Sequence, residues 1–137
     1  MITDHHRKVL MADDDEEDCF LAKEALSESG VKAIFSCVED GFELIEYLSG
    51  HSRSDQDGLP DLILLDLNMP RKDGREALME IKSDPTLKNI PVVILTTSGE
   101  KKDIKFTMKA GANSFITKPE TFNEWVEMMK SLAESWL

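Results

Sequence analysis

The chain has 137 residues, of which 41% are hydrophobic and 31% are charged, and its formal net charge is -11 at pH 7. This length and composition predict one globular domain, residues 1–137, with a core of its own. The negative charge repels phosphate backbones and anionic lipid, so it disfavours nucleic-acid and membrane binding and favours metal cations and basic partners. No apolar run approaches the ~20 residues needed to cross a bilayer. We expect a cytoplasmic protein.

The chain has two cysteines, Cys19 and Cys37, which are too far apart for a CxxC pair. Neither a disulfide framework nor a zinc site is indicated by that spacing. Two separate thiols in a reducing compartment are the simplest interpretation.

Short apolar runs alternate along the chain with segments of helical period. Gly30 marks the end of the first helix, and a polar loop that ends at Pro60 precedes the third strand. Asp73 is a suitable cap for the third helix. The expected elements are strand 9–12, helix 15–29, strand 31–38, helix 42–48, strand 61–65, helix 75–82, strand 91–95, helix 100–108, strand 114–117 and a helix from 121 onward.

This alternation is a strand–helix unit repeated five times. The strands read as continuous apolar runs, which is typical of parallel strands that are covered on both faces. Right-handed crossovers then predict an α/β fold with an open, doubly wound parallel sheet. Ligands of such sheets bind outside the carboxyl ends of the strands.

Polar residues of distinct chemistry follow four of the five strands. Asp13 and Asp14 come after the first strand, and Asp66 ends the apolar run of the third. Thr96 ends the fourth strand and Lys118 follows the fifth. Each has an ordinary explanation alone, as a helix-start acid, a turn acid, a strand residue or a surface lysine. Their placement at one edge of the sheet favours a functional site.

The residue types at this edge suit phosphoryl chemistry. Asp13, Asp14 and Asp66 would raise one another's pKa unless a cation lies between them. Oxygen ligands without His or Cys suit Mg²⁺. Lys118 offers a charge for a phosphoryl oxygen, Thr96 offers a hydroxyl, and a carboxylate such as Asp66 is able to form an acyl phosphate.

These residues, with the DLNMP and DG segments around Asp66, resemble the CheY-like response-regulator receiver domains over essentially the full length. The resemblance implies a flavodoxin-like three-layer sandwich, a five-stranded sheet of order 2-1-3-4-5, and no output domain. It also implies a two-component phosphorelay in which Asp66 accepts a phosphoryl group from a histidine kinase. Such a protein is a phosphoacceptor that catalyses its own phosphotransfer and dephosphorylation, and is not otherwise an enzyme.

The same resemblance assigns further roles. Asp14 and Asp66 bind Mg²⁺ through side chains, Asn68 through its backbone carbonyl, and Asp13 through water. Lys118 contacts the phosphoryl group, and the bond between Lys118 and Pro119 is expected to be cis.

Three residues beside the phosphoacceptor are expected to tune hydrolysis, namely Asn68, Thr97 and Ser98. Thr96 and Phe115 form the expected switch pair, in which the threonine hydroxyl moves toward the phosphate and the aromatic ring fills the vacated space.

The last two helices carry more apolar residues than one core stripe needs. We expect the surface of the fourth helix, fifth strand and fifth helix to bind a partner or a second copy of the chain. Its expected contact residues are Ile104, Phe106, Met108, Trp125 and Trp136.

The segments around Asp66 and Thr96, together with the long loop before the third strand, resemble stand-alone regulators that pair with phytochrome-type kinases. Such regulators often form homodimers through the surface just described.

Two other interpretations remain open. The chain could be a Mg²⁺-dependent phosphohydrolase with an Asp nucleophile, although the position two residues after Asp66 holds Asn68 and not a second acid. It could also be a scaffold that has lost phosphorylation.

Overall fold

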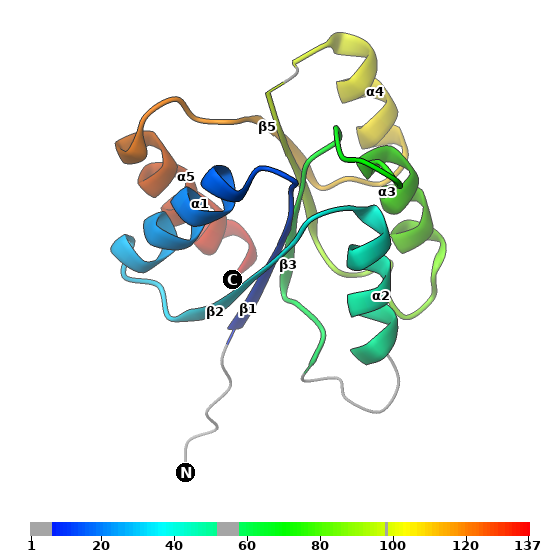
Figure 1. Ribbon diagram of the computed structural model, residues 1–137, viewed down its shortest axis with the longest axis horizontal. Coiled ribbons are helices and arrows are strands. Elements are labelled where there is room, and N and C mark those ends of the chain that lie inside the picture. Colours follow the sequence, from blue (N-terminus) through cyan, green and yellow to red (C-terminus); the bar gives the residue numbers. More distant parts are fainter. Residues whose placement is uncertain (1–6, 52–57, 98) are drawn as a thin grey trace.

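The computed structural model describes residues 7–51, 58–97 and 99–137, and its strands and helices alternate as the sequence predicts (Figure 1). The elements are β1 Arg7–Ala12, α1 Glu16–Glu28, β2 Ala33–Val38, α2 Gly41–His51, β3 Leu62–Leu65, α3 Gly74–Ser83, β4 Val92–Thr96, α4 Lys101–Lys109, β5 Ser114–Thr117 and α5 Phe122–Trp136.

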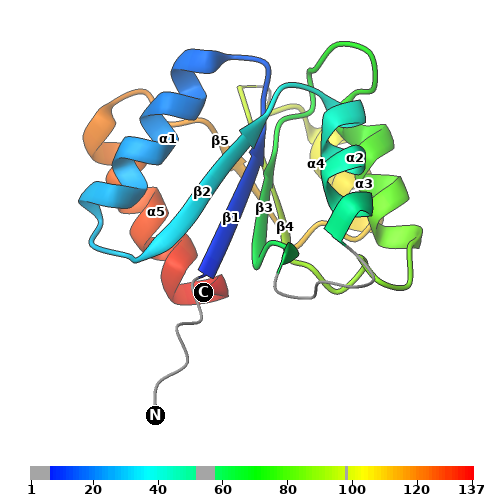
Figure 2. The ribbon, with the colours of Figure 1, turned by 60° about the horizontal axis from the view of Figure 1, so that its bottom comes forward.

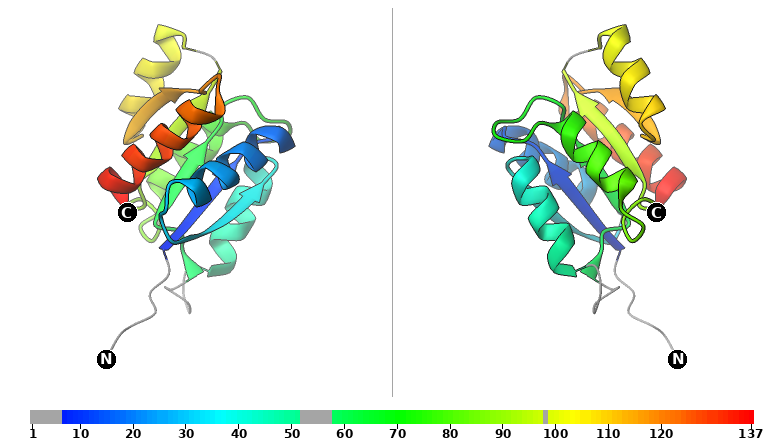
Figure 3. Two further views of the ribbon diagram at one scale, coloured as in Figure 1. Left: turned by 90° about the vertical axis from the view of Figure 1, so that its left-hand side faces the viewer. Right: turned by 90° about the vertical axis from the view of Figure 1, so that its right-hand side faces the viewer.

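The five strands form one parallel sheet in the order β2-β1-β3-β4-β5, as expected. Helices α1 and α5 lie side by side on one face, and α2, α3 and α4 cover the other (Figures 1 and 3). Figure 2 shows the sheet between these two helical layers. The chain is therefore a flavodoxin-like three-layer α/β sandwich.

Both faces of the central strands are buried, which explains their uninterrupted apolar sequence. In β1, Val9 and Met11 pack toward α1 and α5, whereas Leu10 and Ala12 pack toward α2 and α3. All four residues of β3 and all five of β4 are buried. Such strands cannot shift register without exposing apolar surface, so the residues at their carboxyl ends have fixed positions.

Side-chain caps determine where several helices begin. Asp15 accepts hydrogen bonds from the amides of Glu17 and Asp18, which starts α1. Asp73 caps α3 as expected from the sequence, and α5 begins with a capping box formed by Thr121 and Glu124. None of the described helices is both long and apolar enough to cross a membrane.

The prediction of two separate thiols is wrong. Cys19 of α1 and Cys37 of β2 form a disulfide, with Cα atoms 6.4 Å apart. The two residues are 18 positions apart in the sequence. Helix α1 crosses back over the sheet and brings its first turn beside the end of β2, which residue spacing alone does not reveal.

Gly74 permits a close contact between the start of α3 and the end of β3. A Cβ at this position would overlap the backbone carbonyl oxygen of Asp66 and lie 2.8 Å from the Cα of Leu67. The Gly74 amide donates a hydrogen bond to the carbonyl oxygen of Leu67 (3.0 Å). Gly74 is therefore a spacer that fixes the backbone of Asp66.

We predict that Gly74→Ala lowers the free energy of unfolding by about 1–3 kcal/mol, because the methyl group must displace backbone atoms. Urea denaturation followed by circular dichroism measures the change. Gly50→Ala is the matched control, since nothing lies within 4 Å of a Cβ at Gly50, which is also within a helix. There the same change should stabilise by roughly 0.5–1 kcal/mol. Equal effects of the two substitutions would contradict the close contact.

Candidate functional site

Three carboxylates meet at the edge where the strands end. Asp13 and Asp14 follow β1, and Asp66 follows β3, the neighbouring strand in the sheet. Each offers one oxygen atom, and these three atoms lie within 4.8 Å of one another. Asp13 and Asp66 are buried, whereas Asp14 is exposed. The structure therefore brings together the acids that the sequence places at separate strand ends.

Lys118 supplies the positive charge of this cluster. Its Nζ lies 2.7 Å from Asp13 Oδ2, 2.7 Å from Asp18 Oδ2 and 3.8 Å from Asp66 Oδ2. The side chain is largely buried, and the Lys118 backbone amide donates to the carbonyl oxygen of Thr96 (2.8 Å). The lysine is thus fixed at both ends.

Burial sets the protonation behaviour of the two inner acids. It raises the pKa of the Asp13 carboxyl to about 6, and Lys118 only partly offsets this effect. Burial also raises the pKa of Asp66, while Lys118 and a hydrogen bond with Thr96 oppose the rise. Because the pKa of Asp13 is raised on folding, its ionisation destabilises the metal-free protein progressively as pH rises from about 4 to about 6.

Opposing effects act on the lysine. Burial disfavours its charge, but the contacts with Asp13 and Asp18 outweigh burial and raise the pKa of the Lys118 ammonium. Lys118 is therefore charged throughout the physiological pH range. One ammonium faces three carboxylates, which leaves the site with excess negative charge.

The donor set fits a hard divalent cation. All three clustered ligands are carboxylate oxygens, which Mg²⁺ prefers over nitrogen or sulfur. Asp13 Oδ2 is also fully buried, and Lys118 Nζ lies 2.7 Å from it. A buried oxygen in this state retains a lone pair for a further ligand.

Residues 9–130 match the model of a protein family described as "Response regulator receiver domain". The chain belongs to this family. Response regulator Rcp1 of Synechocystis sp. is 36% identical over 129 residues, which cover 94% of this chain and 88% of Rcp1. The receiver domain thus matches most of the length of this relative.

Solved structures of related proteins have the same fold. The phosphorylated cyanobacterial phytochrome response regulator RcpA is 44% identical, with a TM-score of 0.86 over 96% of this chain and 94% of RcpA. The Mn²⁺-bound form of Rcp1 is 35% identical, with a TM-score of 0.82 over the same shares of the two chains. One relative was thus solved phosphorylated and the other with a divalent metal ion.

The other predicted residues of this receiver domain stand at or just after the ends of β3 and β4 in the sequence. Thr96 is fully buried at the end of β4, and it forms the hydrogen bond with Asp66 already described. Asn68 and Thr97 are exposed, and the backbone amide of Asn68 donates to Asp66 Oδ1 at 3.5 Å. Ser98 lies outside the described residues.

Three further expectations have different outcomes. Phe115 is half-buried against the core on the α4 side of the sheet, a position compatible with the switch. Trp125 is only 2% exposed and packs in the core between α5 and the sheet, so it is not a surface contact. The expected cis bond before Pro119 is wrong, since the described residues contain no cis peptide bond.

A second loop supports the segment that follows Asp66. Arg71 has a positive φ of 63°, and its Nε donates to Asp40 Oδ2 (2.8 Å) at the end of β2. The Gly41 amide donates to the carbonyl oxygen of Lys72 (2.9 Å). These contacts stabilise an uncommon backbone conformation and fasten the loop after β3 to the loop after β2.

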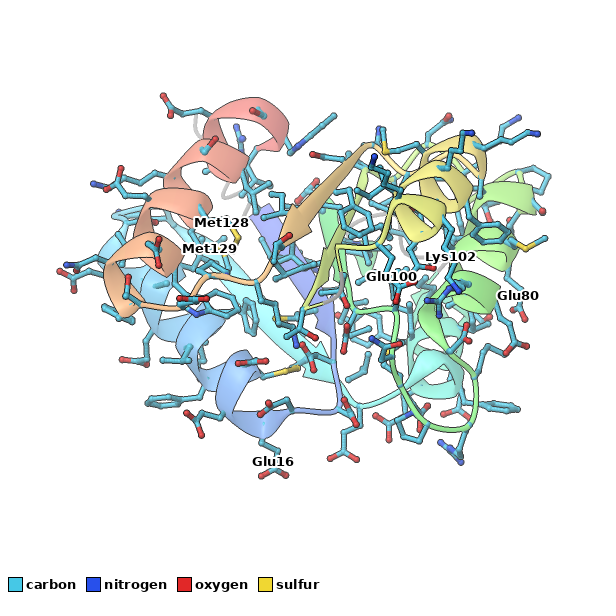
Figure 4. The ribbon with its side chains drawn as sticks, turned by 90° about the horizontal axis from the view of Figure 1, so that it is seen from above. Glu16, Glu80, Glu100, Lys102, Met128 and Met129 are labelled. Atoms are coloured by element: carbon cyan, nitrogen blue, oxygen red, sulfur yellow. A yellow bond between two sulfur atoms is a disulfide. The ribbon has the colours of Figure 1, made fainter. Side chains whose placement is uncertain are left out.

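Asp18 is a residue of the site that the sequence did not predict. Its carboxylate accepts a hydrogen bond from Lys118 across 100 residues of sequence, although acids at a helix start normally face solvent. Glu16, by contrast, points outward in Figure 4, which views the edge where the strands end. Helical phase was the available signal: Ala22, Ala25 and Leu26 are buried, and Asp18 precedes them on the same face.

Proposed function

We propose that this receiver domain accepts a phosphoryl group on Asp66 from the phosphohistidine of a histidine kinase, with Mg²⁺ in the acidic pocket. One observation carries the proposal: three carboxylate oxygens lie within 4.8 Å of one another, and Lys118 Nζ lies 3.8 Å from Asp66. This arrangement holds a nucleophile, a cation site and an ammonium in one place, which is what phosphoryl transfer requires.

In the proposed transfer an Asp66 oxygen attacks phosphorus. The new P–O bond gives an acyl phosphate, and the P–N bond breaks with its electron pair returning to the imidazole ring. Asp66 reacts as the ionised carboxylate, which Lys118 and Thr96 favour against burial. The buried strand holds the nucleophile in a fixed position, so little reorganisation precedes attack.

The residues proposed to hold Mg²⁺ are Asp14 and Asp66 through their side chains, Asp13 through water and Asn68 through its backbone carbonyl. When bound, the ion neutralises charge on the carboxylates and on the phosphoryl oxygens. Lys118 then serves the phosphoryl group as a second, fixed positive charge.

The signal is proposed to leave the site through Thr96 and Phe115. A phosphoryl group on Asp66 favours the conformation in which the Thr96 hydroxyl faces it, and the Phe115 ring follows. This is a shift between existing conformations, biased by new contacts at the pocket. Asn68, Thr97 and Ser98 are proposed to tune autodephosphorylation. The size of side chains beside the phosphoacceptor affects how easily water approaches the phosphoryl group, and Asn68 and Thr97 are exposed.

The proposed phosphodonor is a phytochrome-type histidine kinase in the cytoplasm. The similarity to RcpA, which is described as a cyanobacterial phytochrome response regulator, supports this choice. Within residues 1–137 we propose a single receiver domain whose output is a surface interaction.

We predict that Mg²⁺ and acetyl phosphate give one hydroxylamine-sensitive phosphoryl adduct on the wild-type protein and none on Asp66→Asn. Intact-protein mass spectrometry measures the adduct, with EDTA as the metal-free control. Asp61→Asn is the matched variant because Asp61 immediately precedes β3, at its other end, and binds the Lys8 amide (2.8 Å). It should be phosphorylated like the wild type.

The same reaction separates the alternatives. A phosphohydrolase would release phosphate continuously without accumulating an adduct. A scaffold without phosphorylation would show no adduct in any variant. Either result would contradict the proposal.

Helix α4 buries polar side chains and exposes apolar ones, which supports a docking role. It buries Asp103 and Thr107, and it exposes Ile104, Phe106 and Met108. Asp103 is paired with Arg75 of α3 (2.8 Å), and the Thr107 hydroxyl donates to the Asp103 carbonyl oxygen (2.7 Å). A helix that turns apolar residues outward gains stability when a partner covers them.

We propose that a second copy of the chain covers this surface, α4–β5–α5, and that Trp136, half-buried at the end of α5, belongs to it. Phe106→Ala should then shift the protein toward monomer in sedimentation-velocity runs at several concentrations. Phe20→Ala is the control, because Phe20 is 60% exposed on α1, which is not one of the three elements of this surface. An unchanged sedimentation coefficient in Phe106→Ala would exclude this dimer.

A further inference from the structure

Asp18 is the acid at the site that the proposed phosphotransfer leaves without a role. It lies in the first turn of α1, is half-buried, and its Oδ2 accepts a hydrogen bond from Lys118 Nζ at 2.7 Å. It does not belong to the group of three carboxylates close enough to share a metal ion. Within the part of the chain that the structure describes, the Asp18 side chain contacts Lys118.

The Lys118 ammonium is not equally close to the three carboxylates around it. Nζ is 2.7 Å from Asp13 and from Asp18, which follow β1, but 3.8 Å from Asp66 Oδ2, beyond hydrogen-bond distance. The lysine is therefore held toward the β1–α1 side of the pocket and away from the phosphoacceptor.

Asp13 and Asp18 differ in what else they are able to bind. The negative charge of Asp13 is shared with a cation when the pocket is loaded, since Asp13 belongs to the cluster of three acids. Asp18 lies outside that cluster, so its charge continues to act on Lys118. A hydrogen-bonded carboxylate lowers the electrostatic attraction that the ammonium exerts on an incoming anion.

We propose that Asp18 is a positioning residue that restrains Lys118 and thereby slows phosphoryl transfer to Asp66. The inference rests on the proposed function, because it assumes that Lys118 stabilises the transferred group. Asp18 does not touch the reacting atoms. It determines how much of the charge of Lys118 reaches them, and a phosphoryl oxygen must compete with the Asp18 carboxylate for the ammonium.

The kinetic test compares Asp18→Asn with the wild type in acetyl phosphate at saturating Mg²⁺, the saturation being established for each variant. The initial rate of adduct formation should rise roughly three- to tenfold, the range of the net contribution of one typical hydrogen bond, because Asn keeps an acceptor oxygen but loses the charge. A variant that was merely damaged would react more slowly. An unchanged or lower rate in folded Asp18→Asn would overturn the inference.

Two further variants separate position from charge. Glu17→Gln removes the same charge from the same helical turn. Glu17 is exposed, and its backbone amide, which the substitution keeps, donates to Asp15 Oδ1. The substitution should change the rate less than twofold, as expected for an exposed charge. Asp18→Glu keeps the carboxylate and should retain the slow rate. If Glu17→Gln accelerated the reaction as much as Asp18→Asn, general electrostatics and not restraint would be the cause.

A second measurement needs no phosphorylation. The ammonium signal of Lys118 is observed by ¹⁵N NMR in the metal-free protein and assigned by its loss in Lys118→Met. We expect slow proton exchange at this ammonium in the wild type and in Glu17→Gln, and faster exchange in Asp18→Asn. Equal exchange in all three proteins would overturn the inference. If the wild type forms no adduct but the NMR difference is found, the proposed function fails while the restraint stands.

Discussion

Mutual repulsion among buried carboxylates is the constraint on which the site depends. A parallel sheet ends its strands at one edge, so acids placed after β1 and β3 must meet there. Burial makes their ionisation unfavourable, as the raised pKa of Asp13 shows. One ammonium, that of Lys118, does not balance three negative charges. The site therefore favours whatever brings additional positive charge, and this preference supports the proposed binding of a cation.

The remainder of the fold keeps these groups from moving apart. Gly74 lets α3 start against the backbone of Asp66, and the pair Asp40–Arg71 fastens the loop that follows. The opposing side of the pocket is fixed by α1, whose first turn is capped by Asp15. Groups that repel one another remain close only where the surrounding backbone leaves no alternative.

Much of this arrangement was predictable because local patterns and topology agree. Continuous apolar runs located every strand to within a few residues, and the rule for parallel sheets gathered Asp13, Asp66 and Lys118 at one edge. Contacts that depend on helix rotation were not predicted. Asp18 read as a solvated helix-start acid, and Cys19 as a free thiol, because their partners are set by how α1 lies on the sheet.

Apolar character alone also misassigned one residue. Trp125 and Phe106 are both apolar residues of the last two helices, yet Trp125 is buried and Phe106 is 41% exposed. On α4 the buried positions are polar, so composition gives no indication of which face is inward. The ion pair between Asp103 and Arg75, which only the tertiary structure reveals, explains why a charged side chain of α4 faces inward.

Thermal unfolding with and without Mg²⁺ tests most directly whether crowded carboxylates form a cation site. At neutral pH, MgCl₂ at about 100 times its dissociation constant should stabilise the wild-type protein by about 2.7 kcal/mol relative to EDTA. Sodium chloride at equal ionic strength controls for screening. Asp14→Asn should lose most of the stabilisation. No rise in melting temperature with Mg²⁺, or an equal rise in Asp14→Asn, would contradict the account.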